Sequence, residues 1–336
     1  MKIKSAKTIT RLLAVVLAAA MLCGCSRETE ENTEGENTAG NNVIITETGE
    51  VIEKATPSPE KTAEPVATQE PLTSTEVSTE EQPEEQTQVQ DGRLQIVFLG
   101  DSIFAAHEDG TDIPARTAAQ CDARGYNLAI GGTTAAVADK HASLGWDDWT
   151  STSLVGVVHA IVGNISTDVF EGYDVKEILD DPNIDFSQTD YFVIQYGVND
   201  FLSAVPMSDS SKELDLRSYV GALRYAVSTL KGYAPDATIV LCSPTYARFY
   251  NGDWMIGDGN SINNGYGTLY DYKDTCEYVA NEYQVVFYNA YEWLGIDGYT
   301  ADEYLEDGIH LTDKGRQLYA DALTKLILET EETKNN

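Results

Sequence analysis

The chain has 336 residues, of which 55 are acidic and 22 are basic, so its formal net charge is −33. A protein this acidic is repelled by nucleic acids and by anionic membrane surfaces, which argues against either as its principal partner. The charge leaves the substrate or ligand open.

The first 25 residues have the features of a signal peptide. Lys2, Lys4, Lys7 and Arg11 form a basic start, and the apolar run from Leu12 to Leu22 is too short to span a bilayer stably. The run ends in Leu22-Cys23-Gly24-Cys25, which resembles a bacterial lipobox. That resemblance implies cleavage before Cys25 and lipidation of its thiol. The alternative is ordinary secretion with cleavage at a small residue.

Residues 26–92 have the composition of a disordered stalk. They hold 17 acidic and 3 basic residues and are rich in Thr, Glu and Pro. Such a segment buries too little apolar surface to fold, and its charge and prolines keep it extended. With the lipobox, it predicts an extracytoplasmic protein held on the cell membrane by a lipid anchor, which suits a Gram-positive surface. The membrane contact is then through the lipid alone.

Residues 93–336 form a single predicted domain in which apolar strands alternate with amphipathic helices. In chain order we expect strand 94–99, helix 112–124, strand 126–130, helix 148–163, strand 191–196, helix 213–231, strand 238–242, helix 268–283, strand 285–288 and helix 312–328. Nearly continuous apolar strands separated by helices indicate a parallel sheet covered on both faces. We therefore predict an α/β fold, a three-layer α/β/α sandwich around a five-stranded parallel sheet.

Polar or glycine residues follow each of the first three predicted strands. Ser102 follows the first strand, Gly131-Gly132 the second and Asn199 the third. In open parallel sheets the functional site lies beyond the carboxyl ends of the strands. These residues are therefore expected to meet at one edge of the sheet.

Ser102 is the candidate nucleophile, and it needs a base to accept its proton. His310 is the candidate base, because Asp307 three residues earlier can orient its imidazole and stabilise the charged form. Local turns would explain both motifs equally well in isolation. The remaining histidines lie in polar loops or an apolar helix: His107, His141 and His159.

An oxyanion formed during attack on an ester needs donors that are fixed in advance. The Asn199 side-chain amide and the backbone N–H groups of Gly132 and Ser102 are the candidates. Glycine suits a place where the backbone must approach a ligand closely. Simple turns that end the strands are the alternative explanation.

Together these motifs resemble the SGNH (GDSL-type) hydrolases. Four blocks appear in the family order: Gly100-Asp101-Ser102-Ile103, Asn127 to Gly132, Gly197-Val198-Asn199-Asp200 and Asp307-Gly308-Ile309-His310. Ile103 stands where leucine is commonest, and Ala129 replaces a usual glycine. The resemblance implies a flavodoxin-like sandwich and a serine mechanism through an acyl-enzyme. It also implies that the enzyme uses no metal and no other cofactor.

The cysteines beyond the signal peptide are expected to be packing residues. Cys121, Cys242 and Cys276 fall in predicted helix, strand and helix, and an odd number cannot all pair internally. A disulfide between two of them remains open for an exported protein. No CxxC motif or closely spaced His/Cys set points to a structural metal site.

The substrate is predicted from the loop over residues 244–267, which is aromatic and rich in glycine and asparagine. Candidate substrate-binding residues are Asp101, Tyr246 and Trp254. The aromatic rings could stack on sugars, although ordinary packing would explain them equally well. We expect an ester substrate, and in particular an acetylated glycan. The sequence leaves the oligomeric state open.

Other functions remain open at this point. The same residues would serve a broad short-chain esterase, a thioesterase or a lysophospholipase. A non-catalytic glycan-binding surface lipoprotein belongs to another class, but it would not need Ser102 or His310. A solute-binding lipoprotein usually needs two lobes, whereas this domain has one set of strands.

Overall fold

The computed structural model describes residues 92–105, 109–137 and 150–334. The predicted signal peptide, Cys25 and nearly all of the predicted stalk lie outside these residues. Within the described ranges, no helix is both long enough and apolar enough to cross a membrane.

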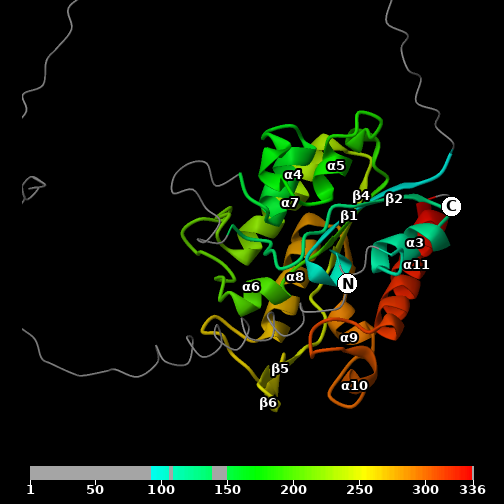
Figure 1. The fold of residues 1–336 in the computed structure, drawn as a ribbon. Helices are drawn as coiled ribbons and strands as arrows, with labels where there is room; N and C mark the ends of the chain where they lie inside the picture. The colour runs from blue at the N-terminus through cyan, green and yellow to red at the C-terminus, as the bar shows by residue number, and fades with distance from the viewer. Residues whose placement is uncertain (1–91, 106–108, 138–149, 335–336) are drawn as a thin grey trace, which may run out of the picture. The chain divides into compact units, whose positions relative to one another are not determined.

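A five-stranded parallel sheet forms the centre of the domain (Figure 1). Its order is β2-β1-β3-β4-β7. The strands are β1 (Gln95–Gly100), β2 (Arg124–Asn127), β3 (Tyr191–Gln195), β4 (Thr238–Cys242) and β7 (Val286–Tyr288). Every residue of β1 and β3 is buried, as expected for strands covered on both faces. The predicted α/β class and the five parallel strands are confirmed.

Helices cover both faces of this sheet. On one side α3 (Ile113–Gln120) packs against α11 (Asp313–Lys334), and on the other α7 (Tyr219–Tyr233) packs against α4 (Leu154–Ile161) and α8 (Leu269–Tyr283) (Figure 1). The α8 helix starts at a capping box, in which Thr268 and Asp271 satisfy each other's backbone N–H groups. These helices correspond to the five predicted from the sequence.

Several element boundaries differ from the prediction. The α7 helix starts at Tyr219 rather than residue 213, because the Ser218 side chain caps it by accepting the Gly221 N–H. The second strand begins at Arg124 and ends at Asn127, although the Leu128 and Ile130 N–H groups still bond to β1 carbonyls. Helix α4 is shorter than predicted, whereas α11 is longer at its carboxyl end.

The sequence analysis missed the short elements. Single-turn helices are α2 (Ser102–Ala105), α5 (Val175–Leu179), α6 (Val198–Leu202), α9 (Ala290–Trp293) and α10 (Ala301–Tyr304), and 3₁₀ turns span Thr167–Phe170 and Phe186–Gln188. The predicted loop 244–267 contains an antiparallel hairpin, β5 (Arg248–Asn251) and β6 (Trp254–Asp258). The two residues of its turn are Gly252 and Asp253, and Gly252 adopts a φ of +62°. A glycine at the first turn position is a sequence signal for a hairpin.

The three cysteines in the described part of the chain are free thiols. Cys242 lies in β4 and Cys276 in α8, both buried, and the Cys276 thiol contacts the Cys242 carbonyl oxygen at 3.7 Å. Cys121 caps the end of α3 rather than lying inside it. All three are packing residues in this structure, without a disulfide.

The contact between β2 and α3 gives a test of the fold. A Cβ atom added at Gly125 would lie 2.6 Å from the Cβ of Ala118, so Gly125→Ala forces the helix away from the strand. We expect a loss of roughly 1–3 kcal/mol in the free energy of unfolding, measured by urea titration. Gly232→Ala, at an open position in α7, is the control and should be neutral or stabilising by up to about 1 kcal/mol. Equal stability of the two variants would contradict this packing.

Candidate active site

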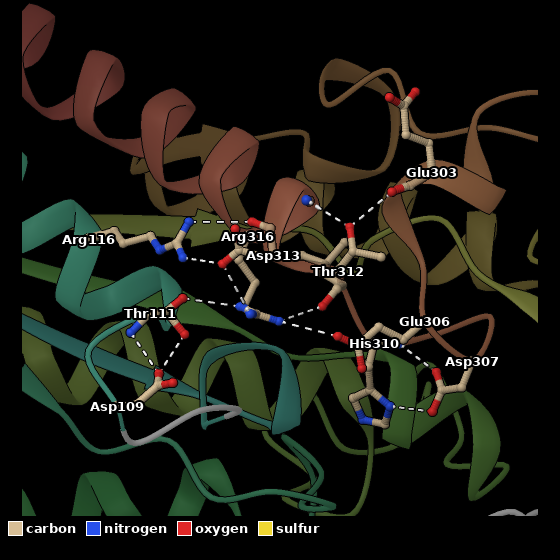
Figure 2. Close-up of polar contacts among 12 residues, drawn as sticks. Asp109, Thr111, Arg116, Glu303, Glu306, Asp307, His310, Thr312, Asp313 and Arg316 are labelled. Carbon is tan, nitrogen blue, oxygen red and sulfur yellow. Dashed lines mark hydrogen bonds and ion pairs between the residues drawn. The ribbon is translucent and has the colours of Figure 1, made fainter.

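Three side chains from distant parts of the chain form a continuous hydrogen-bonded row. The Ser102 Oγ lies 2.9 Å from the Nε2 of His310, and the His310 Nδ1 lies 2.8 Å from the Oδ2 of Asp307. Figure 2 shows the imidazole directed at the Asp307 carboxylate. Ser102 and His310 are 208 residues apart in sequence. The arrangement matches the roles of nucleophile, base and orienting carboxylate.

The loop that carries Asp307 and His310 is fixed by its own hydrogen bonds. The second Asp307 oxygen accepts the N–H groups of Ile309 and His310, at 3.0 and 2.9 Å. One carboxylate therefore holds both the backbone turn and the imidazole. The loop closes with the Glu306 N–H donating to the His310 carbonyl at 2.8 Å.

Gly308 lets this loop pack against the hairpin. Its φ is +94°, and a Cβ atom there would lie 2.5 Å from the Arg248 carbonyl oxygen and 2.8 Å from the Tyr250 ring. The Arg248 N–H donates to the Gly308 carbonyl at 2.7 Å. Only glycine fits both the conformation and the space. The base and the β5–β6 hairpin are therefore in direct backbone contact.

The pair of ionisable groups is tuned for proton transfer. Burial alone would raise the pKa of Asp307, but the hydrogen bond and charge of His310 and the backbone N–H groups outweigh it and lower the pKa to about 2. The hydrogen bond to Asp307 raises the pKa of His310 above its ordinary value, and burial opposes this only partly. Asp307 thus stays ionised while His310 gains and loses a proton.

The three predicted oxyanion donors follow the ends of β1, β2 and β3. Asn199 lies on α6, directly beyond β3, and its Nδ2 is buried without a hydrogen-bond acceptor among the described residues. Ser102 is the first residue of α2, where a backbone N–H has no acceptor within the helix. Gly132 has a φ of +80° in the turn beyond β2. An unpaired buried amide is costly, and this fits the predicted role of Asn199 as a donor to the substrate.

Asp200 is a site residue that the sequence analysis missed. Its buried carboxylate accepts the N–H groups of Ala135 and Ala136, at 2.9 and 3.1 Å. These bonds fix the chain just after Gly132 to the helix that carries Asn199. Its place directly after Asn199 in the third block was the available signal.

Two of the candidate substrate-binding residues are corrected by the structure. Asp101 is fully buried, and its Oδ1 accepts the Ile103 N–H at 2.9 Å, so it caps α2 beneath the nucleophile. Tyr246 is 2 % exposed, and its hydroxyl donates to Asp258 within the hairpin region. Neither side chain reaches solvent where a substrate would bind. Trp254, by contrast, is 81 % exposed on β6.

A cavity of about 500 Å³ opens beside the nucleophile. It follows the free edge of β2 and is bounded on the far side by the segment around α5. Its lining includes Ser102, Ala105, Asp112, Asn127, Ala129, Ile130, Gly131, Tyr173 and Val175. Gly131, rather than Gly132, contributes to this wall.

Among the described residues, His159 is the other histidine, and it does not contact Ser102. His159 is buried on α4, where the Tyr225 hydroxyl lies 2.7 Å from its Nε2, and burial lowers its pKa to about 4. No group of three or more His, Cys, Asp or Glu side chains that could hold a metal ion occurs in the described ranges. His107 and His141 lie outside those ranges.

A serine nucleophile, an oriented histidine and fixed donors at the edge of a parallel sheet define a serine hydrolase of the α/β class. The chain belongs to the GDSL-like lipase/acylhydrolase family, whose model matches residues 98–318. Members of this family hydrolyse esters.

One solved crystal structure supports the fold. It is 19% identical to this chain with a TM-score of 0.52, and the match covers 69% of this chain and 95% of that structure's chain. A possible lipase from Chitinophaga pinensis is 17% identical, with a TM-score of 0.49 and coverages of 71% and 99%. The lipase/acylhydrolase from Enterococcus faecalis is 17% identical, with a TM-score of 0.40 and coverages of 70% and 95%. The comparison with curated proteins gives no match.

The Asp307–His310 pair predicts a pH effect. Only neutral His310 accepts the serine proton, so kcat/KM should rise with pH through the raised pKa of His310. In Asp307→Asn the main cause of that raised pKa is gone, so the acid limb should move to lower pH while kcat falls roughly 10²–10⁴-fold. Rates measured with p-nitrophenyl acetate across pH check both effects. An acid limb that stays in place would show that Asp307 does not act on His310.

Proposed function

We propose that this protein is a serine esterase that removes acetyl groups from a polysaccharide outside the cytoplasm. The observation that carries the esterase part is the Ser102–His310–Asp307 row, with contacts of 2.9 and 2.8 Å. The buried Asn199 amide nitrogen, which has no acceptor among the described residues, is available as an oxyanion donor. The more specific part of the proposal is that the ester substrate is an acetylated glycan.

The geometry supports a two-step mechanism. The Ser102 oxygen attacks the ester carbonyl while His310 Nε2 takes the hydroxyl proton, and Asp307 stabilises the imidazolium. The side-chain amide of Asn199 and the backbone N–H groups of Ser102 and Gly132 donate hydrogen bonds to the negatively charged carbonyl oxygen. His310 then gives its proton to the leaving alcohol, which leaves an acyl-serine. Water, deprotonated by His310, releases the acid and restores the serine.

The position of the hairpin supports a glycan as the alcohol part of the substrate. Trp254 is largely exposed on a hairpin whose other strand is bonded to the catalytic loop at Gly308. An exposed aromatic ring on a hairpin that contacts the catalytic loop suits stacking on the apolar faces of sugars. The strongly acidic chain also disfavours anionic lipid aggregates as substrates. A short-chain esterase, thioesterase or lysophospholipase would use the same triad.

The proposed location rests on sequence alone. We infer that Cys25 is lipidated and that residues 26–92 act as a stalk, which holds the enzyme at the outer face of the cell membrane. A polymeric substrate suits an enzyme held outside the cell, because polysaccharides do not enter the cytoplasm intact.

The first test is ester hydrolysis. The purified protein should hydrolyse p-nitrophenyl acetate faster than the butyrate and decanoate, and it should release acetate from acetylated xylan. Ser102→Ala should lower these rates at least about 10³-fold, because the nucleophile is lost. Asn199→Ala should lower kcat by roughly 10²–10³-fold, the usual effect of losing one oxyanion donor. Preference for decanoate would instead favour lipid substrates, and no turnover by folded protein would favour a binding role.

A second test separates polymer binding from chemistry. Trp254→Ala should raise KM for acetylated xylan several-fold and leave p-nitrophenyl acetate unaffected, because only the polymer reaches the hairpin. Tyr278→Ala is the matched control, since Tyr278 is 54 % exposed on α8, away from the catalytic loop. If Trp254→Ala raises KM equally for both substrates, Trp254 does not bind the polymer.

A further inference from the structure

Arg316 lies behind the catalytic loop, near the start of α11, and is 5 % exposed. Its Nη1 donates to the Leu311 carbonyl at 2.9 Å and lies 3.5 Å from a Glu306 carboxylate oxygen. Its Nε donates to the Thr111 carbonyl at 3.1 Å. Figure 2 shows the guanidinium between Thr111 and the loop that carries His310 and Asp307.

These contacts surround the catalytic pair. Glu306 directly precedes Asp307, and Leu311 directly follows His310, so one guanidinium holds both ends of the loop. Thr111 lies in the segment that leads from the nucleophile helix α2 towards α3. The same cation therefore ties the catalytic loop to the segment that enters α3.

We propose that Arg316 is a positioning residue that sets the distance and angle between His310 and Ser102. The proposal rests on the serine esterase activity proposed above. Arg316 touches no reacting atom in this geometry, and it acts through Glu306, Leu311 and Thr111.

The chemistry of arginine explains why this residue type is needed. A planar guanidinium presents five N–H donors in fixed directions, so it can serve three separate chain segments at once. A lysine ammonium is a single point charge on a flexible stem and cannot span them. A buried cation is also stable only where partners surround it, which favours a single arrangement of the loop.

Arg316 also acts on the charge around His310. The groups that face His310 are Asp307 and Glu306 from its own loop and Asp101 from the turn after β1, and all three raise its pKa. Arg316 pairs with Glu306 and so offsets part of that negative charge. Without Arg316, the acid limb of kcat/KM should move to higher pH.

Arg116 on α3 provides a matched control. It pairs with Asp313 and donates to the Gln317 side chain at 2.7 Å, so it joins α3 to α11 as Arg316 joins neighbouring segments. No bond from Arg116 to residues 306–311 is present in the described structure. The Arg316 Nη2 also donates to the Asp313 carboxylate at 3.4 Å, so the two arginines share this partner. Loss of Arg116 should affect packing between the helices and leave the contacts of Arg316 with Glu306, Leu311 and Thr111 in place.

The experiment compares Arg316→Met, Arg316→Lys and Arg116→Met with the unaltered full chain on p-nitrophenyl acetate. Arg316→Met should lower kcat about 10²-fold with KM within about twofold, because displacing a catalytic group by 1 Å costs that much. Its acid limb should shift upwards, and Arg316→Lys should recover only part of kcat. Arg116→Met should lower the melting temperature and keep kcat and the pH profile.

The outcomes are separable. If folded Arg316→Met keeps the kcat and pH profile of the unaltered enzyme, Arg316 is structural only and the proposal is overturned. Should Arg316→Met not fold, Arg316→Lys decides, because a lysine variant with full kcat and an unmoved acid limb overturns it equally. If the unaltered enzyme and Ser102→Ala are both inactive, the serine esterase function itself has failed.

Discussion

The parallel pairing of β1 with β3 is the constraint on which the site depends. Gly100 is in register with Gln195, so the two strands end at the same level, and Ser102 and Asn199 follow within a few residues. The sheet order places β2 on one side of this pair and β4 on the other, so the chain leaves the two strands in different directions. A crevice forms at such a switch point, and the nucleophile and the predicted oxyanion donor follow the two strand ends that border it.

The catalytic base, His310, is positioned differently, because it does not follow a strand of the sheet. His310 lies on a short loop before α11, a helix that packs on α3. Its geometry is therefore set by hydrogen bonds within the loop, by the hairpin at Gly308 and by the buried guanidinium of Arg316. The site thus combines a part dictated by the sheet with a part assembled from side-chain contacts.

This division explains what could be predicted from the sequence. Apolar strands and the motifs beyond them depend on local pattern, so the five strands and the positions of Ser102, Asn199 and His310 could be inferred from it. Burial at a particular residue depends on packing between distant segments, and the burial of Asp101 and Tyr246 was therefore missed. The roles of Asp200 and Arg316 were missed for the same reason, since their partners are remote in sequence or on another element.

The buried carboxyl groups of Asp101 and Asp200 make the stability of the fold and the activity of the enzyme depend on pH in opposite directions. Burial raises the pKa of Asp101 to about 7 and that of Asp200 to about 6, whereas the unfolded chain would release these protons near pH 4. Between those values the folded form binds more protons than the unfolded form, so the free energy of unfolding falls as pH rises. Catalysis needs the opposite, because His310 must be unprotonated. A rise in pH that favours turnover therefore lowers the free energy of unfolding.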